Sequence, residues 1–347
     1  MGKLIRIGMD TSKHVFQLHG VDGEEKVALR KQLRRRDLET FFDSLEPTVV
    51  VIEACAGAHH MARRLRSWGH TPKLLAPQHA VPFRGRNKND AADAEGLCTA
   101  GGRPEMRFVP EKTPEQQAEL MLMGVRDALI RARTQLANAI RGYAAEYGLI
   151  APKGLANVEA LLERVAADAD LPAFARKLFA LQGEQYDAIE AGIEEVEAEL
   201  RALVRSTDVC RRLKTIPGVG PVGAVLFAVK VPEPEAFESA RGLPAWLGLT
   251  PADHSTGGKQ RLGGITRAGD EQLRAVLING AMAVIQQARR KGDAADPWLK
   301  AMLARKPTKL VAVALANKMA RIAWVLMTKG GRYEPGRRAR NAVGEAP

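Results

Sequence analysis

The first hundred residues alternate between short apolar runs and polar or glycine-containing breaks. Period-two or continuous apolar patterns predict strands over residues 4–10, 15–21, 26–33, 48–54 and 71–77. Helix-like patterns predict short helices over 37–44, 59–68 and about 90–100. The run 48–54 is almost wholly apolar, as expected for a strand buried on both faces. Three strands in a meander followed by strand and helix in alternation predict an α/β layer with a mixed sheet.

From residue 113 the apolar spacing becomes helical. It predicts helices over 113–147 and about 172–205, separated by a break that contains Pro152 and Gly154. The second helix has heptad-like apolar spacing with acids between the apolar positions. The spacing alone leaves two interpretations open, a projecting coiled-coil hairpin and an ordinary helical bundle.

The C-terminal part begins with Gly218-Val219-Gly220 between two apolar helical segments. This arrangement is typical of a helix-hairpin-helix element, whose glycine turn presents backbone N–H groups to a phosphate. A simple helical corner is the alternative. Helices predicted over 273–288 and 309–329 would complete a compact domain. We therefore expect domains at 1–108, 109–206 and 207–332, and a basic tail at 333–347 that is disordered until it meets nucleic acid.

The net charge of the 347-residue chain is +12, and it is unevenly distributed. Residues 255–347 hold 18 Lys and Arg against 6 Asp and Glu, whereas the first 254 residues hold 34 of each. A basic part attached to a neutral part indicates a polyanionic partner for the C-terminal region. The alternative, a solvated basic tail, accounts only for residues 337–340.

Other features exclude several classes of protein. The three cysteines, Cys55, Cys98 and Cys210, lie far apart, which argues against a zinc site or a disulfide framework and favours a reducing compartment. No run of eighteen apolar residues occurs, and the N-terminus reaches Asp10 too soon for a signal peptide. We expect no membrane partner.

Four acids stand at positions where carboxylates could converge. Asp10 and Glu53 end apolar strands, and Asp90 and Asp93 share one face of a helical turn. Carboxylates from three elements could hold one or two Mg²⁺ ions, which prefer oxygen ligands and leave positions to water and phosphate. Each acid alone has a simpler explanation, such as Asp90 capping its helix.

These motifs resemble a known family. Asp10 in GMDTSK, Glu53 in VIEACAG and the helix NDAADAEGL resemble the DEDD catalytic domain of bacterial insertion-sequence transposases. The resemblance implies an RNase H/RuvC-like N-terminal domain, a coiled-coil linker that serves dimerisation, and a mainly helical C-terminal domain. It covers most of the chain.

The stretch STGGKQRLGGITRAG is similar to the serine motif of the same transposases. The resemblance makes Ser255 the nucleophile, although Thr256 beside it leaves some choice of hydroxyl. His254 is a weak candidate for the base, because neighbouring side chains usually point apart. A metal-held water or a carboxylate of the DEDD site could deprotonate the serine instead.

The rest of that stretch consists of cations and glycines. Lys259, Arg261 and Arg267 could neutralise the charge of the transition state and hold the DNA backbone. Glycines let the loop approach DNA closely, namely Gly257, Gly258, Gly263 and Gly264. A flexible basic loop that happens to contain a serine is the alternative. Further nucleic-acid contacts are expected at Gly218, Gly220, Arg84, Arg86 and Lys88.

The resemblance as a whole implies a DNA recombinase that cuts and joins donor and target DNA in two Mg²⁺-assisted transesterifications. Attack by Ser255 would leave a covalent serine–DNA intermediate and a free 3′-OH. It further implies a non-coding guide RNA from the element, a dimer or tetramer, and a bacterial cytoplasmic location, nucleoid-associated during the reaction. Two alternatives remain: a RuvC-like structure-selective nuclease that uses water, and a non-catalytic nucleic-acid-binding protein.

Overall fold

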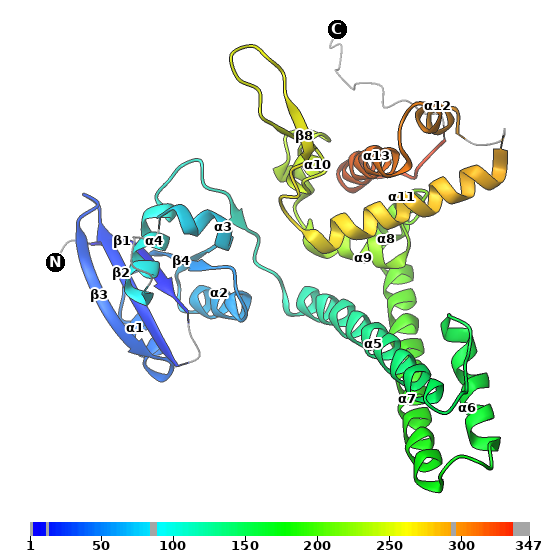
Figure 1. Ribbon diagram of the computed structural model, residues 1–347. Helices are drawn as coiled ribbons and strands as arrows, with labels where there is room; N and C mark the ends of the chain where they lie inside the picture. The colour runs from blue at the N-terminus through cyan, green and yellow to red at the C-terminus, as the bar shows by residue number, and fades with distance from the viewer. Residues whose placement is uncertain (1–2, 12–13, 84–88, 293–295, 336–347) are drawn as a thin grey trace. The chain divides into compact units, whose positions relative to one another are not determined.

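The computed structural model describes residues 3–11, 14–83, 89–292 and 296–335 (Figure 1). The chain divides into two compact units, Met1–Gln117 and Ala118–Pro347. Most of the helical region expected at 109–206 therefore belongs to the same unit as the C-terminal helices.

The first unit is built on a six-stranded sheet in the order β3-β2-β1-β4-β5-β6. The strands are β1 (Leu4–Asp10), β2 (Val15–Asp22), β3 (Val27–Arg34), β4 (Val49–Glu53), β5 (Thr71–Leu75) and β6 (Phe108–Val109). β4 lies parallel to β1 and β5, and the other neighbours are antiparallel. The predicted mixed sheet and its opening meander are confirmed. β6 was not predicted, because two residues are too few to show a period.

Helices cover both faces of this sheet. The helices are α1 (Leu38–Asp43), α2 (Ala58–Ser67), α3 (Pro77–Ala80) and α4 (Asp90–Gly101). Ile7 and Met9 of β1 are fully buried in a core that includes residues of α1 and α2. Because successive side chains of a strand point to opposite faces, Arg6, Gly8 and Asp10 face the other side, where α4 lies.

Gly8 sets the distance between α4 and the sheet. A Cβ atom at this position would stand 2.1 Å from the carbonyl oxygen of Ala94 and 2.4 Å from the amide nitrogen of Cys98. Both are backbone atoms of α4, so a larger residue could be accommodated only by moving the helix. The absent side chain therefore allows α4 to lie directly on β1.

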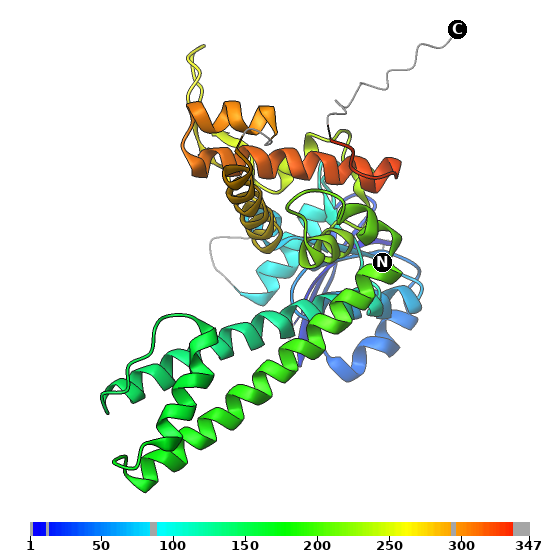
Figure 2. The ribbon, with the colours of Figure 1, turned by 90° about the vertical axis from the view of Figure 1, so that its right-hand side faces the viewer.

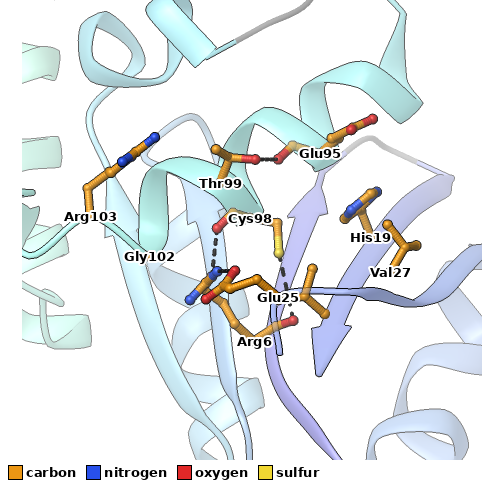
Figure 3. Close-up of a pocket in the computed structure, with 10 residues that line it drawn as sticks. Arg6, His19, Glu25, Val27, Glu95, Cys98, Thr99, Gly102 and Arg103 are labelled. Carbon is orange, nitrogen blue, oxygen red and sulfur yellow. Dashed lines mark hydrogen bonds and ion pairs between the residues drawn. The ribbon is translucent and has the colours of Figure 1, made fainter. Parts of the chain in front are cut away.

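Arg6 holds the other end of α4. Its Nε donates a hydrogen bond of 2.7 Å to the carbonyl oxygen of Cys98, and its guanidinium pairs with Glu25 (Figure 3). Gly102 leaves room for this group, since a Cβ there would stand 2.7 Å from the Arg6 side chain. Together Arg6 and Gly8 position α4 on β1 from its last turns to its middle.

The second unit is helical apart from one β-hairpin among its described residues. Its helices are α5 (Pro114–Ala145, which begins in the first unit), α6 (Val158–Ala167), α7 (Ala173–Ser206), α8 (Asp208–Leu213), α9 (Pro221–Lys230), α10 (Gly242–Trp246), α11 (Glu271–Lys291), α12 (Pro297–Arg305) and α13 (Thr308–Lys329). The hairpin consists of β7 (Pro251–Asp253) and β8 (Leu262–Ile265).

The two longest helices, α5 and α7, pair antiparallel (Figures 1 and 2). Arg126 of α5 pairs with Glu197 of α7 at 2.6 Å, and Arg133 pairs with Glu190 at 3.0 Å. Residue numbers on α7 fall as those on α5 rise, as expected for antiparallel helices. Near the end of α5 and the start of α7, α6 packs into an apolar cluster with residues of both helices, through Val158, Leu161 and Val165. The sequence predicts the two long helices but not α6, which is ten residues long and closely follows the break at Pro152 and Gly154.

The C-terminal helices form a separate core. Residues of α7, α8, α9, α11 and α13 meet in one apolar cluster. By length and composition α13 could cross a membrane, with a mean hydropathy of 1.6 over its most apolar window. Its buried residues, which include Leu315 and Met319, lie within that cluster, so the structure accounts for its apolar character as a core helix.

Replacing Gly8 tests the contact between β1 and α4. We expect Gly8→Ala to lower the free energy of unfolding by roughly 1–3 kcal/mol, as overpacking does. Thermal unfolding of the full chain measures this effect. Gly23→Ala is the matched control, since nothing lies within 4 Å of a Cβ there. Equal melting temperatures for the two variants would contradict the proposed role of Gly8.

Candidate active site

Two of the four predicted acids end neighbouring parallel strands. Asp10 is the last residue of β1 and Glu53 the last residue of β4. Met9 pairs with Ile52, so the next residues along both strands reach the same edge of the sheet together. Their position in the alternation places both carboxylates on the face that α4 covers.

The other two acids lie in the first turn of α4. The side chain of Asn89 caps this helix by accepting a hydrogen bond of 2.8 Å from the amide of Ala92. The cap position is therefore taken, and the explanation of Asp90 as a helix cap is wrong. Asp90 is exposed, whereas Asp93, one turn further, is only 9% exposed.

Electrostatic repulsion links the four acids. Burial, followed by repulsion from Asp90, Asp93 and Glu53, raises the pKa of Asp10 above its ordinary value. Like charges raise a carboxyl pKa only when they lie close enough to oppose ionisation. The tertiary structure thus brings together acids that are separated by up to 83 positions, from residue 10 to residue 93.

The donor chemistry of this group fits a divalent cation. It consists of carboxylate oxygens, the ligands that Mg²⁺ prefers, and their repulsion would be relieved by positive charge. Among the described residues, however, no three side chains of the metal-binding types stand in a geometry that could hold an ion as they are. Holding one would require side-chain movements within this group.

The predicted serine loop is a β-hairpin. Thr256 and Lys259 pair across Gly257 and Gly258, which have φ values of 58° and 76°. Positive φ at both central positions is the geometry of a tight hairpin turn, and only glycine adopts it without strain. Figure 1 shows this hairpin extending beyond α10 and α11 of its unit. The sequence predicted a glycine-rich basic loop here, and the structure shows that this loop is the end of a two-stranded hairpin.

Within the hairpin, the Ser255 hydroxyl has two defined partners. It donates a hydrogen bond to Oδ1 of Asp253, and it accepts one of 3.0 Å from the amide of Arg261. The amide of Ser255 also donates to Asp253 Oδ1, at 2.8 Å. These bonds, the side-chain bond first, lower the pKa of Asp253, so the carboxylate is ionised at neutral pH.

The other predicted residues near Ser255 fall into two groups, His254 and three cations. His254 lies on the opposite side, with its ring 3.2 Å from the position that a Cβ of Gly263 would occupy. This orientation agrees with the low weight given to His254 as a base. The side chains of Lys259, Arg261 and Arg267 are exposed. None of these three has an ion-pair partner within the part of the chain that the structure describes.

The base of the hairpin is fastened by close backbone contacts. A Cβ on Gly248 would stand 2.3 Å from the amide nitrogen of Ala268, and one on Gly269 would stand 1.9 Å from the carbonyl oxygen of Trp246. Between them, Arg267 has a φ of 56°, an unfavourable value for a side chain of this size. Its amide donates to the carbonyl of Gly248 at 3.2 Å. Arg267 is thus held in a strained conformation beside the serine hairpin.

The two glycines of the predicted helix-hairpin-helix turn have different environments. Gly218, with a φ of 87°, packs against α11, and a Cβ on it would stand 2.8 Å from the carbonyl oxygen of Gly280. Gly220 is exposed at the start of α9 and has open space beside it. Of the two positions, Gly218 is occupied by packing against α11, whereas the surface at Gly220 is open. The predicted contacts Arg84, Arg86 and Lys88 lie outside the described residues.

Comparison with known proteins decides the family. A transposase profile of the DEDD class, named for IS110, matches residues 7–148, and a profile described as the transposase IS116/IS110/IS902 family matches residues 210–296. The protein y4pF/y4sB of Sinorhizobium fredii, which carries a transposase name, is 56% identical over 99% of this chain and 88% of its own.

The chain belongs to the IS116/IS110/IS902 family of transposases.

Two further relatives are transposases for named insertion sequences. The transposase for IS1328 of Yersinia enterocolitica is 38% identical over 95% of this chain and 98% of its own. That for IS1111A of Coxiella burnetii is 38% identical over 95% and 91%. The present protein is accordingly an insertion-sequence transposase, which binds DNA and cleaves and recombines it. Its sheet is consistent with a DEDD, RuvC-like domain.

Asp253 is the residue of this transposase that sequence reasoning missed. An Asp two residues before a Ser, ahead of a Thr-Gly-Gly-Lys turn, is a local hydrogen-bonding pattern that could have been recognised. The pattern of residues predicts a glycine-rich basic loop, and a loop without a strand pattern gives no side-chain direction for Asp253.

Neutralising Asp10 should stabilise the metal-free transposase at neutral pH. Its pKa is raised in the folded state, so the folded state binds more protons and stability falls as pH rises above the ordinary value near 3.8. We expect Asp10→Asn to raise the first melting transition in EDTA by roughly 1–3 °C at pH 7 and by less near pH 4. The exposed Asp43→Asn serves as control. A lower melting temperature for Asp10→Asn at pH 7 would contradict the electrostatic interpretation.

Two substitutions of Arg267 distinguish its backbone strain from its contribution to DNA binding. We expect Arg267→Gly to raise stability by about 0.5–1 kcal/mol, because glycine relieves the positive φ while losing some chain entropy on folding. Arg267→Ala keeps the strain and should show no such gain. Both should weaken DNA binding and reduce its salt dependence. Thermal unfolding and a salt titration of DNA affinity measure these effects. A gain in stability for Arg267→Ala would show that strain is not the cause.

Proposed function

We propose that this transposase cleaves and exchanges DNA strands through a covalent Ser255–DNA intermediate, with Asp10, Glu53, Asp90 and Asp93 holding Mg²⁺. The observation that carries the proposal is the exposed Ser255 hydroxyl, which is held by an ionised carboxylate on a cationic hairpin. A nucleophile must be accessible and hydrogen-bonded to a group that can take its proton. The Ser255 hairpin meets both conditions.

The acid group supports the metal-binding part of the proposal. Burial, followed by repulsion from three nearby carboxylates, raises the pKa of Asp10, and a bound cation would relieve that repulsion. Bound Mg²⁺ would supply charge stabilisation at the attacking and leaving oxygens. Nucleophile and acids belong to separate compact units, so the proposal requires the hairpin to approach the acids, from the same or another subunit.

Exposed cations and a helix start support DNA binding around the serine. Lys259, Arg261 and Arg267 are available to contact phosphates near Ser255. At a second place, the accessible start of α9 at Gly220 could bind a phosphate in the manner of a helix-hairpin-helix element. Contacts of this kind hold the backbone and do not read bases.

Oligomerisation through the α5–α7 hairpin is the third part of the proposal. Strand exchange acts on donor and target DNA, so two or four subunits are expected. The far end of the helical hairpin exposes large apolar side chains, among them Ile150 at 74% and Phe174 at 73%. Phe174, Leu178 and Leu181 recur at helical spacing on α7 and are all exposed. A contiguous apolar stripe of this kind favours a protein contact.

Sequence choice by a non-coding guide RNA completes the proposal. This part of the proposal rests on the resemblance to RNA-guided transposases. It is compatible with a DNA-binding surface made of backbone-directed cations, because base pairing can supply the specificity that the protein does not.

A denaturing gel with labelled DNA tests the serine mechanism. The transposase, Mg²⁺, labelled DNA and the element's candidate RNA are incubated, denatured and examined for label that migrates with protein. We expect an adduct with the wild type and loss of the adduct, by a factor of at least 100, in Ser255→Ala and in Asp90→Asn. Thr256→Ala is the matched control and should keep the adduct.

The same gel distinguishes the alternatives. Cleavage that survives in Ser255→Ala without an adduct would show a nuclease that uses water, and would overturn the serine mechanism. An adduct lost in Thr256→Ala and kept in Ser255→Ala would transfer the role to the neighbouring hydroxyl. DNA binding without cleavage by any form would show a binding protein only.

A further inference from the structure

Within the described parts of the chain, the hydrogen bonds of Ser255 leave one position open on its hydroxyl. A serine hydroxyl has one donor hydrogen and two acceptor lone pairs. The hydrogen is directed to Asp253 Oδ1, and one lone pair accepts the amide of Arg261 at 3.0 Å. The second lone pair is the one that an attack on phosphorus needs. Ser255 is exposed, so a phosphodiester can reach it.

The two partners can assist loss of the hydroxyl proton as the oxygen attacks phosphorus. A carboxylate accepts the proton, and a backbone N–H stabilises the negative charge that develops on the oxygen. Asp253 is the third residue of β7 and Ser255 follows two positions later, so both side chains lie on the same side of the hairpin. The ring of His254 lies on the other side, over Gly263.

We propose that Asp253 is the general base that deprotonates Ser255 and the general acid that returns the proton when the strands are rejoined. The proposal rests on Ser255 being the nucleophile, and it identifies the group that activates it. It requires no proton acceptor from the acid group of the other unit. An aspartate that accepts the proton of an attacking hydroxyl is an established arrangement in phosphoryl transfer, as in protein kinases.

The step balances within this pair and the DNA. The Ser255 Oγ–H bond breaks and its proton passes to Asp253 Oδ1, while the Oγ–P bond forms. The P–O3′ bond breaks, and the 3′ oxygen leaves with the electron pair and takes a proton from water to become the 3′-OH. In rejoining, a 3′-OH attacks the phosphoserine and gives its proton to water, the O3′–P bond forms as the Oγ–P bond breaks, and protonated Asp253 gives its proton back to Oγ.

A purely structural role for Asp253 is the main competitor. Its Oδ1 also accepts the amide of Ser255 at 2.8 Å, which could serve only to shape the hairpin. The two roles differ in what asparagine can do. Asp253→Asn keeps an acceptor oxygen for both hydrogen bonds of Ser255, but its amide cannot take up a proton at neutral pH.

The experiment measures the rate of Ser255–DNA adduct formation with full-length protein, Mg²⁺, RNA and DNA. We expect Asp253→Asn to slow it by about 10²–10⁴-fold, as loss of a general base does, with unchanged DNA affinity and melting temperature. Asp253→Glu should recover part of the rate. Added formate should accelerate Asp253→Ala, because the site is open to solvent, and should not accelerate wild type. Asp296→Asn, at the cap of α12, is the matched control and should react normally.

Each result decides between the possibilities. A normal rate for Asp253→Asn, with Ser255→Ala inactive, would leave the serine mechanism intact and overturn the assignment of Asp253. The assignment would also be overturned if Asp253→Asn reacts slowly and melts lower than wild type, and formate does not accelerate Asp253→Ala. That result would give Asp253 a structural role. An adduct that persists in Ser255→Ala would overturn the serine mechanism itself.

Discussion

The closeness of β1 and α4 is the constraint on which the acid site depends. Gly8 has no side chain, so the backbone of the helix rests on the backbone of the strand. The carboxylates of Asp90 and Asp93 come to the edge where β1 and β4 end because their helix lies at this distance. Gly8, which has no functional group of its own and lies two residues before Asp10, thereby helps to determine whether the four acids can act together.

Bringing those acids together works against folding. Burial and three neighbouring carboxylates raise the pKa of Asp10, which means that its ionised form is less favourable in the folded protein than in the unfolded one. The rest of the unit compensates through packing, with both faces of the sheet covered and Arg6 fastening α4. Strain of this kind is typical of a site whose proper occupant carries the opposite charge.

The serine hairpin combines rigidity at its base with access at its end. Backbone contacts at Gly248 and Gly269 leave no room for side chains, and they hold Arg267 in an unfavourable conformation. Beyond that base, cations and hydroxyl are exposed. A hydroxyl placed on a β-ladder has a defined direction, whereas one on an irregular loop does not, and this direction lets Asp253 and the amide of Arg261 act on the same oxygen.

The sequence by itself determined the elements whose patterns are local and long enough to repeat. The strands that end at Asp10 and Glu53 and the helix that carries Asp90 and Asp93 follow from period two, period 3.6 and capping chemistry. It failed at β6, α6 and the β7–β8 hairpin, where the segments are short or rich in glycine and carry no clear period. Only the tertiary structure decided that α4 rests on Gly8, that Gly218 serves packing while Gly220 stays open, and that Asp253 faces Ser255. Each of these depends on the distance between two backbones, a quantity that spacing along one chain does not contain.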